Sequence, residues 1–272
     1  MTLRGVGTVA AVECSKLAAQ FKPRAALAAC AAGSFAFAAA LRLQTTVPED
    51  TLFGRSAKES GFALSLVVLG FAALWVVPAL TSIVAGDLFA AEDRYGTWTM
   101  MLARSRARSE VFAGKALVAF GYSALAIAVL AASSIAAGLL IIGPAPLVNL
   151  SGVALTPSQA LARTAFAWVA TLPAALALTA IALLLSIVTR SSAAGIGVPV
   201  VGALTMQLCA LVDGPQALRT ALITTAFDGW HGLLAEPRYY GPLVRGVLAS
   251  VAYLVVSVGI GYRTLQRRDI AG

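Results

Sequence analysis

The chain has 272 residues, of which 59% are hydrophobic and 12% are charged, and its mean hydropathy is +0.85. A water-soluble domain of this length cannot bury so much apolar surface, so a soluble fold is excluded. The formal net charge of +8 comes from basic residues scattered at the ends of apolar runs, which indicates membrane topology and no nucleic-acid partner.

Residues 1–23 predict an interfacial helix at the amino terminus. Apolar residues recur at helical spacing between Val6 and Phe21, whereas Glu13 and Lys16 fall on the opposite face. We expect this amphipathic helix to lie along the inner membrane surface until Pro23 turns the chain inward.

Six apolar runs are long enough to cross a bilayer. A hydrocarbon core of about 30 Å needs about 20 apolar residues, and in lipid they must be helical to satisfy the backbone. The polar region before the first run is too long for a signal peptide, so that run is kept as a span. The sequence therefore predicts an all-α membrane protein with one transmembrane domain, 1–272. The predicted spans are 25–41, 62–85, 112–142, 164–188, 193–212 and 244–262.

The orientation follows from the 20 lysine and arginine residues. Most of them fall on the side of the membrane that holds both termini, and cytoplasmic segments are enriched in these residues. We therefore expect both termini to be cytoplasmic. Abundant alanine, and more arginine than lysine, is typical of a GC-rich bacterial genome, so the predicted location is the bacterial plasma (inner) membrane.

The segment 87–110, between the second and third spans, is the most polar inner connection. Gly96 can end a helix and Thr97 can cap a new one, which predicts a short cytoplasmic helix lying across the membrane plane. Two interpretations remain open: a positive-inside loop anchored by tryptophan, or a docking helix for a cytosolic partner. The residues expected to share one face of this helix are Tyr95, Trp98 and Leu102.

The longest outer connection, 213–243, contains several prolines around a short helix-like run, together with Trp230 and other aromatic residues typical of membrane interfaces. We expect outer or re-entrant helical structure there, lining an exit. His231 is the only histidine and the three cysteines lack the spacing of metal ligands. The sequence thus predicts no metal site and no intramembrane enzyme, with His231 an ordinary loop residue.

A family resemblance is carried by the polar segment and the start of the third span. The residues that carry it are Glu92-Asp93-Arg94-Tyr95-Gly96-Thr97, Leu102, Arg108 and Gly114-Lys115. They resemble the signature of the ABC type-2 transporter permeases, in which Glu-x-x-x-Gly-Thr is followed by a leucine-rich stretch, an arginine and a Gly-Lys. The tail Arg267-Arg268-Asp269-Ile270 also resembles the ending of that family, whereas Ser105 stands where the family often has proline.

The resemblance implies a permease that pairs with a second permease chain and docks on cytosolic ABC ATPase subunits. ATP and magnesium would be bound by those subunits, with no cofactor on this chain. Gly114-Lys115 itself is no phosphate-binding loop, because an alanine follows it and Ser109 stands where that motif requires glycine. The residues expected to act in ATPase coupling are Glu13, Lys16, Glu92, Asp93, Arg94, Tyr95, Gly96, Thr97, Trp98, Leu102 and Arg108.

Glu92 is expected to matter most for coupling, by pairing with a basic residue of the ATPase or by capping the nearby helix. The alternative is a local ion pair with Arg94 or Arg108, worth under about 1 kcal/mol if exposed.

The predicted function is export of an amphipathic or hydrophobic cargo, such as a drug, an antibiotic or a lipid-like molecule, by alternating access driven by ATP hydrolysed elsewhere. An ion-coupled carrier would keep carboxylates or histidines within its spans, although placing each charge in the bilayer costs about 2.5–3.5 kcal/mol. The predicted spans contain neither residue type. Two alternatives remain: an ion-coupled secondary carrier, and a membrane scaffold of an assembly or maturation complex without cargo flux.

Overall fold

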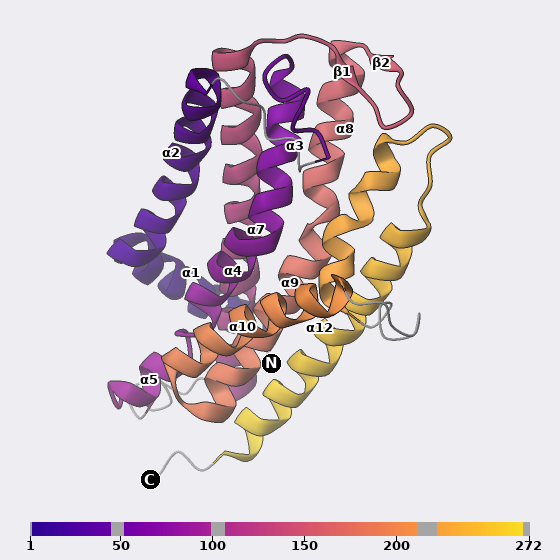
Figure 1. Cartoon of the computed structure of the whole chain (residues 1–272). Coiled ribbons are helices and arrows are strands. Elements are labelled where there is room, and N and C mark those ends of the chain that lie inside the picture. The colour runs from indigo at the N-terminus through magenta and orange to yellow at the C-terminus, as the bar shows by residue number, and fades with distance from the viewer. Residues whose placement is uncertain (1, 45–51, 99–106, 212–221, 269–272) are drawn as a thin grey trace.

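The computed structural model describes residues 2–44, 52–98, 107–211 and 222–268. Nearly all of this part of the chain is helical, as Figure 1 shows. The elements are α1 (Leu3–Ala19), α2 (Phe21–Leu43), α3 (Gly61–Phe71), the π-helix η1 (Ala72–Val76), α4 (Val77–Ala85), α5 (Ala90–Arg94), α7 (Arg108–Ala137), the π-helix η2 (Gly138–Ile142), β1 (Leu147–Val148), β2 (Ala154–Leu155), α8 (Pro157–Ala170), α9 (Leu172–Thr189), α10 (Ser192–Leu211), the 3-10 helix η3 (Ile223–Leu234) and α12 (Gly241–Arg267).

Six helices in the described residues are long and apolar enough to cross a membrane, which confirms the predicted all-α fold with six spans. Each predicted span falls within one of them, except that the predicted end of the fifth, residue 212, lies outside the described residues. Their bounds are Phe21–Leu43, Gly61–Ala85, Arg108–Ile142, Pro157–Thr189, Ser192–Ala210 and Gly241–Arg267.

The fourth span begins at Pro157, earlier than the predicted residue 164. Thr156 forms a capping box there: its side chain accepts from the backbone N–H of Gln159, and the Gln159 side chain accepts from the Thr156 N–H. Pro157 occupies the first turn, where a missing N–H leaves no helical bond unmade. This polar start signal extends the helix beyond its apolar part.

Small and hydroxyl residues hold the central spans together. A Cβ atom on Gly61 of α3 would lie 2.3 Å from the backbone of Gly138 in η2, so only glycine allows this approach. Nearby, Ser65 and Ser134 share a hydrogen bond of 2.8 Å, and Trp168 Nε1 donates to Ser65 Oγ over 3.1 Å. Close backbone approach and interhelical hydrogen bonds are the usual means of helix association in lipid.

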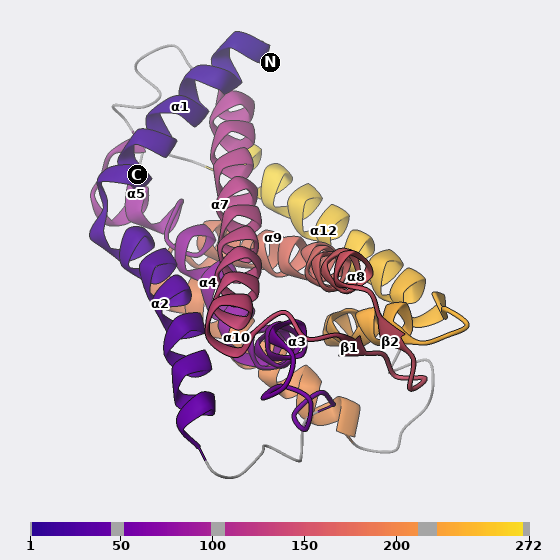
Figure 2. The same cartoon turned by 90° about the horizontal axis from the view of Figure 1, so that it is seen from above.

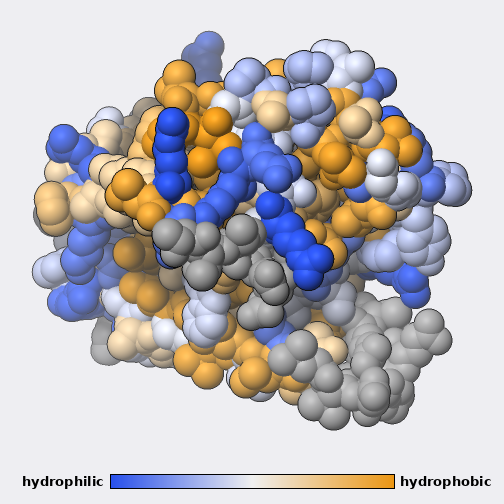
Figure 3. Space-filling view, turned by 45° about the horizontal axis from the view of Figure 1, so that its top comes forward, coloured by the Kyte–Doolittle hydropathy of each residue, from blue (hydrophilic) through white to orange (hydrophobic). Residues whose placement is uncertain are grey.

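The helices α2, α10 and α12 pack on one side only. Only 22%, 17% and 17% of their apolar windows are buried, compared with 67% for Gly61–Ala85. Apolar residues such as Val201 and Leu248 are exposed on them, and Figure 3 shows broad hydrophobic areas on the face it presents. Such surfaces suit lipid or another membrane protein chain.

The start of α1 and the end of α12 lie toward the same end of the bundle as α5, which we call the terminal end (Figure 1). The antiparallel pair β1 and β2, with Leu147 opposite Leu155, lies at the other end, which we call the hairpin end. Viewed from above, α1 is seen along its length while α3 and α8 are seen nearly end on (Figure 2). The helix α1 therefore lies across the direction in which α3 and α8 run.

The face that α1 turns to the bundle differs from the expected one. Gly5, Val9 and Glu13 are buried, so the placement of Glu13 on the face away from the membrane was wrong. The reason is that the buried Lys115 and the half-exposed Lys16 meet its charge, as described below. The chain breaks at Gln20, and Pro23 lies in the first turn of α2, where helix N–H groups have no intrahelical partner.

The predicted outer connection contains a helix that packs along a span. Residues 212–221 lie outside the described residues, and η3 then runs antiparallel to the first turns of α12. A Cβ on Gly246 would lie 2.6 Å from the Cα of Ala226, and one on Gly229 would lie 2.9 Å from the Cα of Leu243. Most of η3 is buried by these contacts, so it is not an exposed loop.

Candidate functional site

Four charged side chains form one cluster at the terminal end. Glu92 Oε1 of α5 lies 2.9 Å from Lys115 Nζ and 3.3 Å from Lys16 Nζ. Glu13 of α1 lies 2.9 Å from Lys16 and 3.2 Å from Lys115. We call these four residues the ion cluster. Two carboxylates and two ammonium groups balance, and together they join α1, α5 and α7.

Burial makes the ion cluster a strong constraint. The Lys115 side chain is 1% exposed, and the Glu13 and Glu92 side chains are 5% and 9% exposed. Lys115 also donates to the carbonyl oxygen of Leu88 over 3.0 Å. Removing one partner of a buried ion pair costs about 3–5 kcal/mol, because the remaining charge has no counterpart. The three helices therefore cannot separate here without a large loss of stability.

The pKa of Glu92 reflects this balance. Burial by itself raises the pKa, but the charge of Lys115, the hydroxyl of Thr97 and the charge of Lys16 outweigh it and lower the pKa below its ordinary value of 4.5. For Lys16, burial acts to lower the pKa, yet Glu13 and Glu92 raise it above 10.5. Both groups are charged at neutral pH.

The Gly-Thr pair of the signature closes the end of α5. Gly96 has a φ of +64°, which side-chain-bearing residues rarely adopt. The Thr97 N–H donates to the Glu92 carbonyl over 3.1 Å, and the Gly96 N–H donates to the Asp93 carbonyl over 3.3 Å, the pattern of a Schellman cap. This turn brings the Thr97 hydroxyl onto the Glu92 carboxylate, to which it donates.

The Gly-Lys pair has two separate roles. A Cβ on Gly114 would lie 2.6 Å from Val9 Cγ1, so glycine lets α1 approach α7 closely. Lys115, the next residue, then reaches Glu13 of α1 and Glu92 of α5. The two halves of the signature, far apart along the chain, meet in this one cluster.

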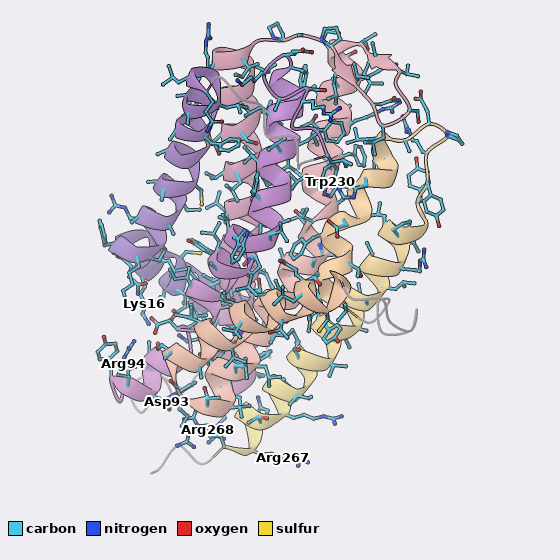
Figure 4. All side chains as sticks on the ribbon, in the orientation of Figure 1. Lys16, Asp93, Arg94, Trp230, Arg267 and Arg268 are labelled. Carbon is cyan, nitrogen blue, oxygen red and sulfur yellow. The ribbon has the colours of Figure 1, made fainter. Side chains whose placement is uncertain are left out.

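Asp93, Trp98 and Arg108 tie the end of α12 to the same region. Trp98 Nε1 donates to Asp93 Oδ1 over 3.0 Å. Arg268 forms an ion pair with Asp93 and its guanidinium lies 5.7 Å from the Trp98 ring centroid. Arg108 donates to the carbonyls of Gln266 and Arg268 over 3.0 and 2.7 Å. Figure 4 shows Lys16, Asp93 and Arg268 at this end of the molecule.

Several expectations for this segment need correction. Glu92 pairs with neither Arg94 nor Arg108; Arg94 lies 2.9 Å from Asp87 instead. Tyr95 and Trp98 do not share a face, since Tyr95 is 72% exposed and Trp98 is 5% exposed. The left-handed turn at Gly96 separates them. Leu102 and most of the predicted transverse helix lie outside the described residues.

Two residues absent from the expected coupling set are central to the site. Lys115 was quoted in the signature but not given a role, although a lysine inside a predicted span is itself a signal of function. Ser186 of α9 accepts hydrogen bonds from the N–H groups of Phe89 and Ala90 over 3.2 and 2.9 Å, which caps α5. A serine within an apolar span carries no comparable signal, so only the fold reveals it.

A cavity of about 620 Å³ lies beside the ion cluster. Its walls come from α1, α4, α5 and α7, and they combine apolar residues such as Val12 and Ile83 with Lys16, Glu92 and the exposed Tyr95. Among the described residues, no group of three or more potential metal ligands is found.

The fold is that of a multi-pass helical membrane protein with six apolar helices. At the terminal end, the transverse helix α1 and the short polar helix α5 are both held to α7 by ion pairs. A family model described as ABC-2 family transporter protein matches residues 11–206. The chain therefore belongs to the ABC-2 family of transporter permeases, as the signature implied. The match extends from α1 through the ion cluster into α10. Comparison with curated proteins yields no match.

Proposed function

We propose that this chain is the membrane-spanning subunit of an ATP-driven exporter in a bacterial plasma (inner) membrane. ATP and magnesium bind to separate cytosolic ABC ATPase subunits, and two permease chains, identical or different, enclose the transport path. The terminal end faces the cytoplasm, where it meets the ATPase subunits. Membership of the ABC-2 family supports this arrangement.

The ion cluster is the observation that carries the proposal. It fastens the two elements available for docking, α1 and α5, to α7. The helix from Arg108 to Ile142 has 35 residues, and at 1.5 Å per residue it is about 50 Å long. A displacement imposed on α5 or α1 is therefore transmitted to the hairpin end, as alternating access requires.

The residues at α5 fall into two groups: one is buried and holds α5 to α7, and the other is exposed and available to a partner protein. Glu92 is buried in the ion cluster and cannot meet a partner protein, whereas Tyr95 is 72% exposed. The Arg94 guanidinium lies 5.1 Å from the Tyr95 ring centroid, and the Arg94 side chain is half exposed. Arg94 and Tyr95 thus present a cationic and aromatic surface, the residue types enriched in the centres of protein interfaces.

A second permease chain has surfaces on which to pack. The helices α2, α10 and α12 leave most of their apolar windows unburied, and a transport path between two chains needs apolar surfaces of this kind. The nearly uncharged spans suit an amphipathic or hydrophobic cargo, such as a drug, an antibiotic or a lipid-like molecule. Export from the cytoplasm or the inner leaflet is the direction we propose.

Co-purification tests the assignment. The tagged chain is extracted gently from its native membrane, and we expect an ATPase subunit to accompany it. Tyr95→Ala should reduce the recovered ATPase about tenfold or more, the loss of one interface anchor, without changing the thermal midpoint of the permease. Tyr239→Ala is the matched control, because Tyr239 is also exposed, at 57%, but precedes α12 at the hairpin end.

The outcome separates the alternatives. Reconstituted vesicles containing both subunits should release cargo only with ATP. Cargo movement without an ATPase would indicate an ion-coupled carrier, and a stable partner complex with no flux would indicate a scaffold. Either result would overturn the exporter proposal.

A further inference from the structure

A second, smaller pocket lies between η3, the α3–η1 segment and α10, far from the ion cluster. Its volume is about 210 Å³, and we call it the η3 pocket. Aromatic side chains form much of its wall: the Phe53 and Trp230 rings stack with centroids 6.3 Å apart, and Phe71 and Phe227 also line it. Figure 4 shows Trp230 nearer the hairpin end, away from the labelled residues of the terminal end.

The pocket reaches the depth of the membrane. Its wall includes residues from Leu66 to Leu74, which belong to the span that begins at Gly61. At 1.5 Å per residue, these positions lie about 8 to 20 Å from that end of the span. Asp228 and His231 of η3 line the same pocket. His231, expected to be an ordinary loop residue, lies instead within the 3-10 helix η3 and lines this pocket. The predicted spans themselves contain no carboxylate, and Asp228 belongs to η3.

Among the described residues, no lysine or arginine pairs with Asp228. It makes no ion pair or hydrogen bond within the described part of the chain, and His231 is the titratable group beside it. It is also exposed, and among the described residues that line the η3 pocket it alone carries a formal charge at neutral pH. An aspartate at membrane depth costs about 2.5–3.5 kcal/mol on insertion scales, and is typically kept for function.

Two further polar groups belong to the pocket. Thr224 is 4% exposed, and its hydroxyl is buried without a hydrogen-bond partner in the described structure. Gln207 of α10 donates from Nε2 to the Leu74 carbonyl over 3.1 Å. Pro78, four residues after Leu74, has no N–H, so it cannot donate the usual α-helical bond to that carbonyl. This contact attaches the pocket wall on η1 to α10.

We propose that the η3 pocket binds the ammonium group of a cationic amphiphile. Asp228 supplies the countercharge, and the aromatic rings that line the pocket, Trp230 among them, supply cation–π attraction, the usual combination for alkylated ammonium groups. The Thr224 hydroxyl is free to accept a hydrogen bond from an N–H of a non-quaternary amine. This inference rests on the proposed function, since it names the chemical class of the cargo.

The size of the pocket supports a headgroup site. A volume of about 210 Å³ is below the roughly 300–1,000 Å³ of pockets that enclose whole drug-sized ligands. Phe71 and Leu74 line the pocket and are also 44% and 39% exposed. An apolar tail can therefore leave the pocket past these side chains and lie along the lipid-facing surface.

Equilibrium binding to the purified chain tests the site. The chain is placed in phosphatidylcholine nanodiscs without ATPase, and binding of decyltrimethylammonium is compared with that of decyl sulfate, which has the same tail. We expect saturable binding of the ammonium compound alone. Asp228→Asn and Trp230→Leu should each weaken it about tenfold or more, while Trp230→Phe, which keeps an aromatic face, should weaken it less.

The controls keep the outcomes distinct. Glu59→Gln removes an exposed carboxylate just before α3 and outside the pocket, and it should leave binding unchanged. Equal binding of decyl sulfate, or unchanged affinity in Asp228→Asn with an unaltered thermal midpoint, would overturn the inference. If Asp228→Asn still recovers the ATPase but wild type shows no ammonium binding, the pocket assignment fails while the exporter proposal stands. If the ammonium compound binds but no ATPase is ever recovered, the exporter proposal fails while the pocket assignment stands.

Discussion

Lys115 Nζ lies 2.9 Å from Glu92 Oε1, so a lysine inside a membrane span and a glutamate of the short helix α5 form one buried ion pair. The same nitrogen lies 3.2 Å from Glu13 of α1. One side chain thus connects the transverse helix, the polar segment and the longest span. The Glu-x-x-x-Gly-Thr and Gly-Lys parts of the family signature describe the two sides of this internal clamp.

Replacing Lys115 should loosen the clamp. Lys115→Met keeps the length of the side chain but leaves Glu13 and Glu92 buried with only the half-exposed Lys16 as counterion. We expect a loss of about 3–5 kcal/mol in unfolding free energy, measured by denaturant or thermal unfolding in detergent.

A double variant separates charge from packing. Lys115→Met combined with Glu92→Gln removes one charge of each sign, and it should recover part of the stability lost in Lys115→Met. Two outcomes would contradict a stabilising ion cluster. One is a Lys115→Met variant as stable as wild type; the other is a double variant whose loss of stability equals the sum of the losses of Lys115→Met and Glu92→Gln.

The turn at Gly96 gives a second prediction. Gly96→Ala forces a residue with a Cβ to a φ of +64°, which should cost about 1–2 kcal/mol and reduce recovery of the ATPase by displacing Thr97 from Glu92. Gly7→Ala is the control: Gly7 lies within α1, and a Cβ there meets nothing within 4 Å. It should be neutral or slightly stabilising, and an equal effect of both changes would contradict the turn argument.

The close approach of α1 to α7 gives a third prediction. In Gly114→Ala the new methyl group would meet Val9 Cγ1 at 2.6 Å, so we expect a loss of about 1–3 kcal/mol from overpacking. Adding Val9→Ala should restore part of it. Gly121→Ala, on the same helix with nothing within 4 Å, should not destabilise the protein. Protease sensitivity of α1 provides the readout, and a Gly114→Ala variant as resistant as wild type would disprove the contact.

The pH dependence of stability gives a fourth prediction. Because the pKa of Glu92 is lowered in the folded protein, the stability that Glu92 contributes is complete above pH 4.5, its ordinary pKa. This stability is lost as the pH falls through the lower pKa of the folded state. Because the pKa of Lys16 is raised, the stability that Lys16 contributes is complete below pH 10.5 and is lost only at higher pH. The stability difference between wild type and Glu92→Gln should therefore be constant from about pH 5.5 to 8 and shrink in stronger acid. A difference that changes with pH inside that range would show that Glu92 is not held by these lysines.

The signature segment shows how far sequence reasoning reached at the site. Gly96 as a helix break followed from its residue type, and it holds in the structure. The coupling role expected of Glu92 stays a prediction; the structure places its carboxylate in the ion cluster. The partners did not follow, because Lys16 precedes Glu92 by 76 residues and Lys115 follows it by 23. Separation along the chain says nothing about distance across a packed bundle. Likewise, residue type alone does not show that Tyr95 is exposed and Trp98 buried. This difference follows from the left-handed turn at Gly96 between them.

By itself the sequence determined six membrane spans and the family of this protein, because apolar length and a short motif are properties of contiguous residues. Only the tertiary structure decided that Glu13 faces the bundle, that Lys115 joins α1 to α5, and that Asp228 and His231 line a pocket at membrane depth. Each of these depends on which segments pack side by side. A buried charge reveals its role through its counterion, and here the buried Lys115 of α7 finds its counterions, Glu13 and Glu92, on two other helices.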